Sequence, residues 1–268
     1  MTPPTLPFLP DGTVYGTLLN FRREAALWVE RAVEAPYKGA PRAPVLYIKT
    51  ANTFSAAGAT IALPMSAPEV DVGASVGLVM GNFKDYWPNP IAEWPQAAIN
   101  SGVHERLSGV AGCVLLNDLS LPHASYYRPP VKYRNLDGFL GVGARVRPLA
   151  AIGDLAALAL TVRINGQLRQ TVELATLVRD AVTLLAEVNA FMTLRPGDIL
   201  MLGTDCLDDG TRPRARVGDR IEIAAPGFEP LVNMLVEEWS ADGPPPGARA
   251  PSGGSEDTAV PSVGVLSS

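Results

Sequence analysis

The 268-residue chain lacks several features that would place it at once in a class of proteins. No apolar stretch reaches the roughly 18 residues that a membrane-spanning helix requires, so no membrane span is expected. Charged residues make up only 18% and the net charge is −5, which argues against a protein that binds nucleic-acid backbones. The first residues, MTPPTLPFLPDG, show neither the basic nor the apolar segment of a signal peptide, and we expect a cytoplasmic protein.

Cysteine and histidine are scarce as well, with two of each. Cys113 and Cys206 lie in apolar surroundings, so we expect reduced core residues and not a disulfide framework. Glycine-rich phosphate loops and the HExxH, CxxC and GxSxG motifs are all absent. His104 lies in a polar stretch and is expected to face solvent. His123 lies in a loop and can act as an acid or base, although a lone loop histidine more often has no chemical role.

Glycine and proline are abundant, with 25 residues each. They divide the chain into short segments, a pattern typical of β-rich folds with many loops. Alternating runs on both sides of Asn165-Gly166 predict a hairpin with a two-residue turn. The other expected elements are strands within residues 12–21, 45–49, 73–81, 110–118, 199–204 and 217–239, and helices within 22–34 and 176–198. The second helix is expected to bury a stripe made of Leu177, Val178, Ala181, Leu184, Leu185 and Val188.

The same reading predicts one domain of the α+β class, mostly β, over residues 12–239. Residues 12–70 form a smaller N-terminal portion of it. Residues 1–11 are rich in proline and are expected to be a flexible arm, and the low-complexity residues 240–268 are expected to be a disordered tail.

An apolar run ends at Asn117 and Asp118, and a loop unusually rich in cations and phenols follows it. The loop contains Tyr126, Tyr127, Arg128, Lys132, Tyr133, Arg134 and Asp137. One interpretation is a solvated loop. The other is a site for an anionic small molecule, because guanidinium forks and tyrosine hydroxyls bind carboxylates. The density of these residues in a chain poor in charge favours the second interpretation.

Five segments, in this order, carry a family resemblance: GTVYGTLLNF, APVLYIKTANTF, LNDLSLPHASYYRPPVKYRNLDGF, LRPGDILMLGT and VGDRIEI. Together they resemble the fumarylacetoacetate hydrolase superfamily over roughly residues 12–239. YYRPPVKYRNLDGF is similar to the N-terminal half, or separate N-terminal subunit, of the bifunctional isomerase/decarboxylases of 4-hydroxyphenylacetate (homoprotocatechuate) degradation. The resemblance implies a mixed β-sandwich roll that forms a homodimer or pairs with a paralogue similar to the C-terminal half.

The resemblance also implies a metal site. In the family, a divalent cation, usually Mg²⁺, is held by a Glu-x-Glu pair on one strand and an aspartate on another. Asp118 matches the aspartate, but Gly73 and Ser75 stand where the glutamates are expected. Glu69 and Asp71 lie nearby but out of register, and a frame shift that recruits them stays open. Since one carboxylate binds Mg²⁺ poorly, we expect weak or no metal binding and little effect of Asp118→Asn.

Other site residues follow from the same match. The family lysine that precedes the loop aspartate falls at Arg134, which can clamp a carboxylate but cannot transfer a proton near neutral pH. Glu24 stands near the family histidine, either as a base or as an ordinary helix-surface residue. The resemblance names Glu24, Lys132 and Arg134 as catalytic candidates, and Lys49, Tyr127, Arg128, Asp137 and Thr204 as substrate-binding candidates. Asp205 follows Thr204 where the family commonly has proline, so this loop is expected to differ.

The implied activity is an isomerase/decarboxylase step of homoprotocatechuate catabolism, on an oxo-tricarboxylate or a 2-hydroxy-diene-dioate, through an enolate. The alternatives are a non-catalytic partner of a metal-bearing paralogue, or a related hydrolase of 1,3-dicarbonyl acids. The missing glutamate pair favours a partner, whereas the retained cations favour an enzyme. Bound metal, and turnover with and without Mg²⁺, distinguish these alternatives.

Overall fold

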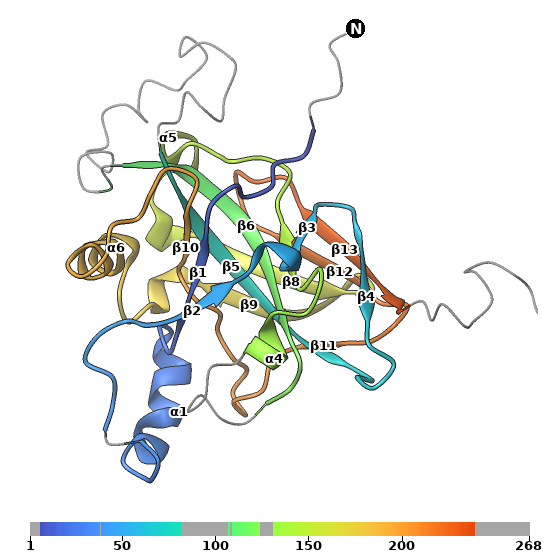
Figure 1. Ribbon diagram of the computed structural model, residues 1–268, viewed down its shortest axis with the longest axis horizontal. Helices are drawn as coiled ribbons and strands as arrows, with labels where there is room; N and C mark the ends of the chain where they lie inside the picture. The colour runs from blue at the N-terminus through green and yellow to red at the C-terminus, as the bar shows by residue number, and fades with distance from the viewer. Residues whose placement is uncertain (1–5, 38, 82–106, 108, 124–130, 239–268) are drawn as a thin grey trace, which may run out of the picture. The chain divides into compact units, whose positions relative to one another are not determined.

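The computed structural model describes residues 6–37, 39–81, 107, 109–123 and 131–238 (Figure 1). Chain contacts divide the protein into Met1–Glu238 and Trp239–Ser268, and all described residues belong to the first unit. The predicted tail, 240–268, therefore lies outside the described residues and stays a prediction. No helix of the described part is long and apolar enough to cross a membrane.

Two β-sheets make up the domain. The larger has eight strands in the order β2-β1-β10-β5-β6-β7-β3, with β11 paired to β5. Its strands are β1 (Val14–Leu18), β2 (Val45–Lys49), β3 (Phe54–Ala56), β5 (Val70–Met80), β6 (Val110–Ser120), β7 (Leu140–Val142), β10 (Ile199–Met201) and β11 (Arg214–Ala215). The smaller, in the order β4-β13-β12-β8-β9, contains β4 (Thr60–Leu63), β8 (Ala159–Ile164), β9 (Gln167–Glu173), β12 (Arg220–Ala224) and β13 (Leu231–Glu237).

Both sheets are mixed. The pairs β1–β10, β3–β7 and β4–β13 are parallel, and the other pairs are antiparallel. The described helices are few and lie outside the sheets: α1 (Arg22–Ala32), α4 (Val131–Arg134), α5 (Leu149–Ile152) and α6 (Ala181–Asn189), with 3₁₀ turns at Ala51–Thr53, Leu155–Ala157 and Leu174–Thr176. This arrangement confirms the predicted fold class, a mostly β domain with mixed sheets.

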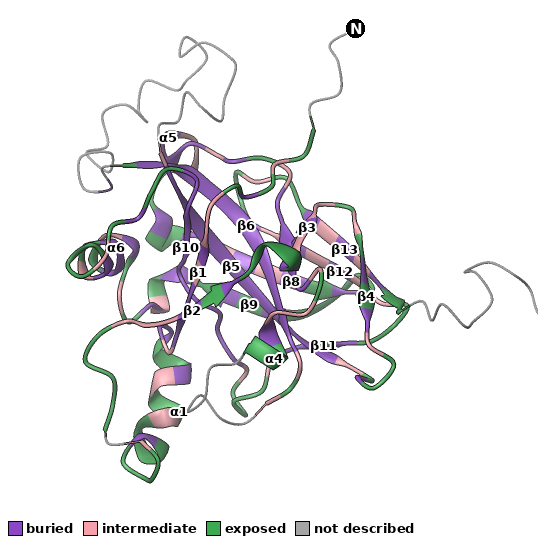
Figure 2. Ribbon diagram, viewed as in Figure 1, coloured by how far each residue is buried: buried purple, intermediate pink, exposed green. Residues whose placement is uncertain are grey.

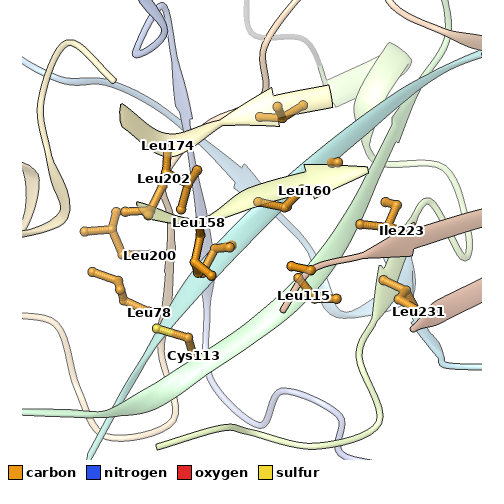
Figure 3. Close-up of a cluster of buried hydrophobic side chains, with 14 of the residues drawn as sticks. Leu78, Cys113, Leu115, Leu158, Leu160, Leu174, Leu200, Leu202, Ile223 and Leu231 are labelled. Carbon is orange, nitrogen blue, oxygen red and sulfur yellow. The ribbon is translucent and has the colours of Figure 1, made fainter. Parts of the chain in front are cut away.

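Strands β5 and β6 run through the centre of the domain and are buried at every position (Figure 2). A strand covered on both faces needs apolar side chains on both, which explains their continuous apolar sequences. The main core lies where the two sheets meet. Figure 3 shows Leu78 and Leu115 of the larger sheet with Leu160 and Ile223 of the smaller one. Both cysteines are free and buried, as expected.

Most long elements lie where the sequence predicted them. Asn165 and Gly166 have φ angles of 52° and 79°, the left-handed geometry that the predicted hairpin turn needs. The buried stripe predicted for the second helix is wrong at Val178. Helix α6 begins only at Ala181, and Val178 is 46% exposed. In the described part of the predicted arm, the amide of Phe8 donates to the Ala144 carbonyl at 2.9 Å and its side chain packs on buried residues; the flexible arm over residues 1–11 stays a prediction.

Candidate functional site

The centre of the candidate site is the pairing of β5 with β6. Gly73 lies directly opposite Asp118 in this antiparallel pair, and Ser75 lies two residues further along β5. Side chains alternate between the faces of a strand, so all three positions belong to one face of the sheet. The three positions that the family resemblance named are thus neighbours in the structure.

The Asp118 carboxylate is bound by two cations and a phenol. Lys49 Nζ lies 2.8 Å from Oδ1, and Arg134 Nη1 donates to Oδ2 at 2.8 Å. The Tyr47 hydroxyl also donates to Oδ2, and the Arg134 guanidinium lies 4.6 Å from the centre of the Tyr47 ring. All four side chains are buried. We call Tyr47, Lys49, Asp118 and Arg134 the Asp118 cluster.

Lys49 also forms hydrogen bonds with the backbone of three separate segments. Its ammonium donates to the carbonyls of Leu119, Arg134 and Phe139 at 3.0, 2.5 and 2.8 Å. Burial lowers the pKa of Lys49 to about 8, although Asp118 opposes the shift. Lys49 therefore anchors the end of β6 to α4 and to the segment before β7.

Burial and charge act in opposite directions on Asp118. Burial raises the pKa of its carboxyl, but Lys49 and Arg134 outweigh this effect and hold the pKa below its ordinary value. Burial and the neighbouring Asp118 raise the pKa of Tyr47. The cluster therefore contains a carboxylate that stays ionised and a phenol that stays protonated.

The residues present do not fit a Mg²⁺ ion at this position. A Cβ atom added at Gly73 would lie 2.7 Å from Thr204 Cγ2 and 2.8 Å from the Asp118 carbonyl oxygen, so a longer side chain has no room there. Both oxygens of Asp118 already face cations. No group of three or more His, Cys, Asp or Glu side chains arranged to hold a metal occurs among the described residues. Mg²⁺ needs several oxygen ligands, and this set supplies too few.

The acidic pair that a frame shift would recruit is engaged elsewhere. Arg214 forms ion pairs with Glu69 at 2.5 Å and with Asp71 at 3.2 Å. Asp71 lies opposite Ser120 and not opposite Asp118. Burial raises the pKa of Asp71 against the opposing charges of Arg212 and Arg214. A site shifted to these carboxylates would have to break their ion pairs.

A pocket of about 490 Å³ lies near the cluster: none of the four cluster residues lines it, but His123 in its wall stacks on Tyr133, the residue before Arg134. Its wall combines residues of α1, the start of β5, the segment after β6 and residues 206–214. The charged or titratable side chains in the wall are Glu24, Arg31, Asp71, His123, Cys206, Asp209, Arg212 and Arg214. Burial lowers the pKa of His123, and the charge of Arg134 adds to this shift; the charge of Arg212 makes a small lowering contribution to the pKa of Tyr47. The pocket wall and the Asp118 cluster are therefore electrostatic neighbours.

Glu24, a predicted catalytic residue, does reach this pocket. Its carboxylate accepts from Arg212 Nη2 at 2.7 Å and from the Leu19 amide at 3.1 Å. Leu19 has a left-handed φ of 56° at the connection between β1 and α1. Glu24 therefore fixes the start of α1, and a role as a base would require it to leave Arg212.

His123 is held by two contacts. Its Nδ1 lies 2.8 Å from the Leu121 carbonyl, and its ring stacks on Tyr133 with the ring centres 5.1 Å apart. A carbonyl only accepts, so Nδ1 carries the proton in the neutral ring. Burial, with Arg134 and Arg212 nearby, lowers the pKa of His123 although the bond to Leu121 opposes the shift. His123 is therefore neutral near neutral pH.

The remaining predicted site residues are not all close to the pocket or to the Asp118 cluster. Thr204 is buried over Gly73 in β5. Lys132 is exposed on α4 and does not line the pocket. Asp137 is exposed and accepts from Asn52 Nδ2 at 2.7 Å. Tyr127 and Arg128 lie outside the described residues, so their predicted roles, like those of the others, stay predictions.

The sequence named Asp71 only as a possible metal ligand and did not identify Arg212 and Arg214 as site residues. Arg212, Arg214 and Arg216 alternate in the sequence RPRAR, which Thr211 separates from an Asp-Asp-Gly segment. Such a cationic run in a chain poor in charge is a signal that was available. The partners of these arginines could not be predicted from the sequence, because Glu24 lies 188 residues away from Arg212 in the chain.

Comparison with known proteins agrees with this fold. Residues 13–236 match the model of the fumarylacetoacetate (FAA) hydrolase C-terminal family. The chain is 34% identical over 231 residues to a 4-hydroxyphenylacetate degradation bifunctional isomerase/decarboxylase of Escherichia coli, covering 85% of this chain and 48% of that protein. It is 27% identical to a 2,4-didehydro-3-deoxy-L-rhamnonate hydrolase of Sphingomonas, covering 74% of this chain and 67% of that one.

A solved structure shows the same fold. The crystal structure of 2-hydroxyhepta-2,4-diene-1,7-dioate isomerase from Mycobacterium marinum superposes with a TM-score of 0.63 at 20% identity, covering 88% of this chain and 78% of that one. The chain spans about half the length of the E. coli relative. With a family match over most of its length, the chain belongs to the fumarylacetoacetate hydrolase family.

Proposed function

We propose that the chain is an isomerase/decarboxylase component of 4-hydroxyphenylacetate catabolism. Its substrate would be a 2-hydroxy-diene-dioate or an oxo-tricarboxylate that reacts through an enolate. The similarity to the E. coli bifunctional isomerase/decarboxylase supports the reaction class. The single observation that carries the proposal is the pocket that joins the Glu24–Arg212 pair, Asp71 and His123 near the Asp118 cluster.

The pocket suits a small dicarboxylate in size and chemistry. Its volume of about 490 Å³ lies within the range of roughly 300–1,000 Å³ of small-molecule sites. Arg212 and Arg214 supply guanidinium groups for carboxylates. His123, neutral near neutral pH, supplies a group that can take up a proton. Ketonisation of a dienol needs these two functions, anion binding and proton transfer.

A second function has its own supporting observation. Thr204 and the β6 backbone occupy the space that a glutamate at Gly73 would need. A chain that has filled its metal position can serve as the non-catalytic partner of a metal-bearing paralogue. A homodimer or such a heteromer stays a proposal, as does a cytoplasmic location.

One experiment separates these functions. The purified chain is mixed with 2-hydroxyhepta-2,4-diene-1,7-dioate, and loss of the diene absorbance is followed; release of carbon dioxide from the oxo-tricarboxylate is followed in parallel. We expect turnover by the chain alone. Arg212→Gln should lower kcat/KM by about 100-fold, because it removes a guanidinium from the pocket wall. The exposed Arg216, outside the pocket, gives the matched control Arg216→Gln.

Two outcomes contradict the enzyme proposal. No turnover by the folded chain alone, with activity appearing only after a metal-bearing paralogue is added, supports the partner function. Equal loss of activity in the Arg212 and Arg216 variants would place the reaction outside this pocket.

A further inference from the structure

One edge of the Arg134 guanidinium has no hydrogen-bond partner among the residues that the structure describes. Its Nη1 donates to Asp118, but its Nε and Nη2 are buried without a hydrogen-bond partner. The residue is only 1% exposed. A buried donor that stays unpaired is costly, and a guanidinium carries its charge at every accessible pH. Such a pair of donors therefore calls for an anionic acceptor.

Asp118 does not neutralise the cluster. Lys49 and Arg134 carry two positive charges, and Asp118 supplies one negative charge. The protonated Tyr47 adds none. The three carbonyls bound by Lys49 account for its three N–H donors, and its contact with Asp118 Oδ1 is an ion pair. One uncompensated positive charge is left, and Arg134 holds the donors that are not used.

The cluster occupies the place that the family resemblance gives to a cation. Asp118 stands at the position of the metal-ligating aspartate and lies opposite Gly73. The pocket is close to this charge, because His123 in its wall stacks on Tyr133, the residue before Arg134, with the ring centres 5.1 Å apart. The charge that a bound cation would give to this position is thus part of the chain itself.

We propose that the Lys49–Arg134 pair stands in for the divalent cation, and that the Nε–Nη2 edge of Arg134 binds a carboxylate or enolate oxygen of the substrate. The inference rests on the proposed function for the identity of that substrate. The two parallel N–H groups of a guanidinium match two oxygens of a carboxylate. Asp118 has the role of counter-ion: it fixes Arg134 by Nη1 and leaves the other edge for the ligand.

Heptanedioate, a saturated and unreactive dicarboxylate of seven carbons, is the probe that tests the inference. Its binding to the full chain is measured by calorimetry in EDTA and in millimolar Mg²⁺. We expect the same affinity in both. Arg134→Lys keeps the positive charge beside Asp118 but removes the forked edge, so binding should weaken by about 10- to 100-fold. The exposed Arg216 gives the matched control Arg216→Lys, with wild-type affinity expected.

A crystal structure of the wild-type chain soaked with heptanedioate keeps the test independent of any variant that fails to fold. A carboxylate oxygen at hydrogen-bond distance from Arg134 Nε or Nη2 supports the inference. Density at another place, no binding by the wild-type chain, unchanged affinity of Arg134→Lys, or a tenfold gain in affinity with Mg²⁺ each overturns it. Binding without turnover supports the anion site and contradicts the proposed function alone.

Discussion

Arg134 Nη1 lies 2.8 Å from Asp118 Oδ2, and neither side chain reaches solvent. Asp118 is therefore a counter-ion at a position where the family resemblance implied a metal ligand. Its neighbour Lys49 lies 2.8 Å from the other carboxylate oxygen. The three residues form a buried ion cluster, and the loss of Asp118 would leave both cations without a negative charge in a region of low dielectric.

Asp118→Asn should strongly destabilise the domain. The carboxamide keeps the shape but leaves Lys49 and Arg134 buried without a negative charge, at a cost of about 3–5 kcal/mol in the free energy of unfolding. The sequence alone had suggested little effect, because it showed no partner for Asp118. Denaturant unfolding measures the change. Asp208→Asn, at a side chain 98% exposed, is the control and should change stability by less than about 0.5 kcal/mol. Equal stabilities of the two variants would contradict the cluster.

Gly73→Ala tests the close packing that excludes a longer side chain. The new Cβ would meet Thr204 Cγ2 at 2.7 Å and the Asp118 carbonyl oxygen at 2.8 Å. We expect a loss of about 1–3 kcal/mol from overpacking, measured by denaturant unfolding. Thr204→Ser removes the clashing methyl group and should restore part of the loss in the double variant. Ser75→Ala, at the next position on the same face of β5, controls for substitution in this strand and should cost less. No gain from Thr204→Ser would place the strain elsewhere.

The fold could be predicted from the sequence better than the site could, because the sequence patterns that indicate strands and turns are local. Continuous apolar runs predicted the cores of β5 and β6, and the Asn165-Gly166 dipeptide predicted the hairpin turn. The short strands β3, β7 and β11 span two or three residues each, too few for any periodic signal. The start of β5 was missed for a related reason: Asp71 is polar, and its partner Arg214 lies 143 residues away.

The site could be predicted only where the family resemblance supplied positions. It named Glu24, Lys49, Asp118 and Arg134, and the structure places the last three in one cluster. It could not indicate that these residues satisfy each other. Glu24 pairs with Arg212 across 188 residues of sequence, a contact without any local pattern. Local sequence identifies residue types, whereas long-range packing decides which charges meet.

A double-mutant cycle on Glu24 and Arg212 tests whether Glu24 acts as a base or as an anchor. The two charges lie 2.7 Å apart, with side chains 5% and 9% exposed. We expect Glu24→Gln and Arg212→Gln to couple by about 1–3 kcal/mol in the free energy of unfolding, because each leaves the other charge without its partner. As an anchor, Glu24→Gln should lower kcat by less than tenfold. A kcat loss of about 100-fold or more, with stability unchanged, would instead identify Glu24 as the base.

The pH dependence of stability should show the low pKa of His123. Burial, with Arg134 and Arg212 nearby, lowers its pKa in the folded state below the ordinary 6.5, while the unfolded chain keeps the ordinary value. As the pH falls through 6.5, the unfolded state takes up the proton first, so the folded state loses stability relative to it. Wild type should therefore lose more free energy of unfolding than His123→Gln between pH 7.5 and about pH 5. His104→Gln is the control, because the sequence predicts that this histidine faces solvent. If wild type and His123→Gln lose stability in parallel, the His123 pKa is not lowered by folding, and its neutral form in the pocket wall has no support.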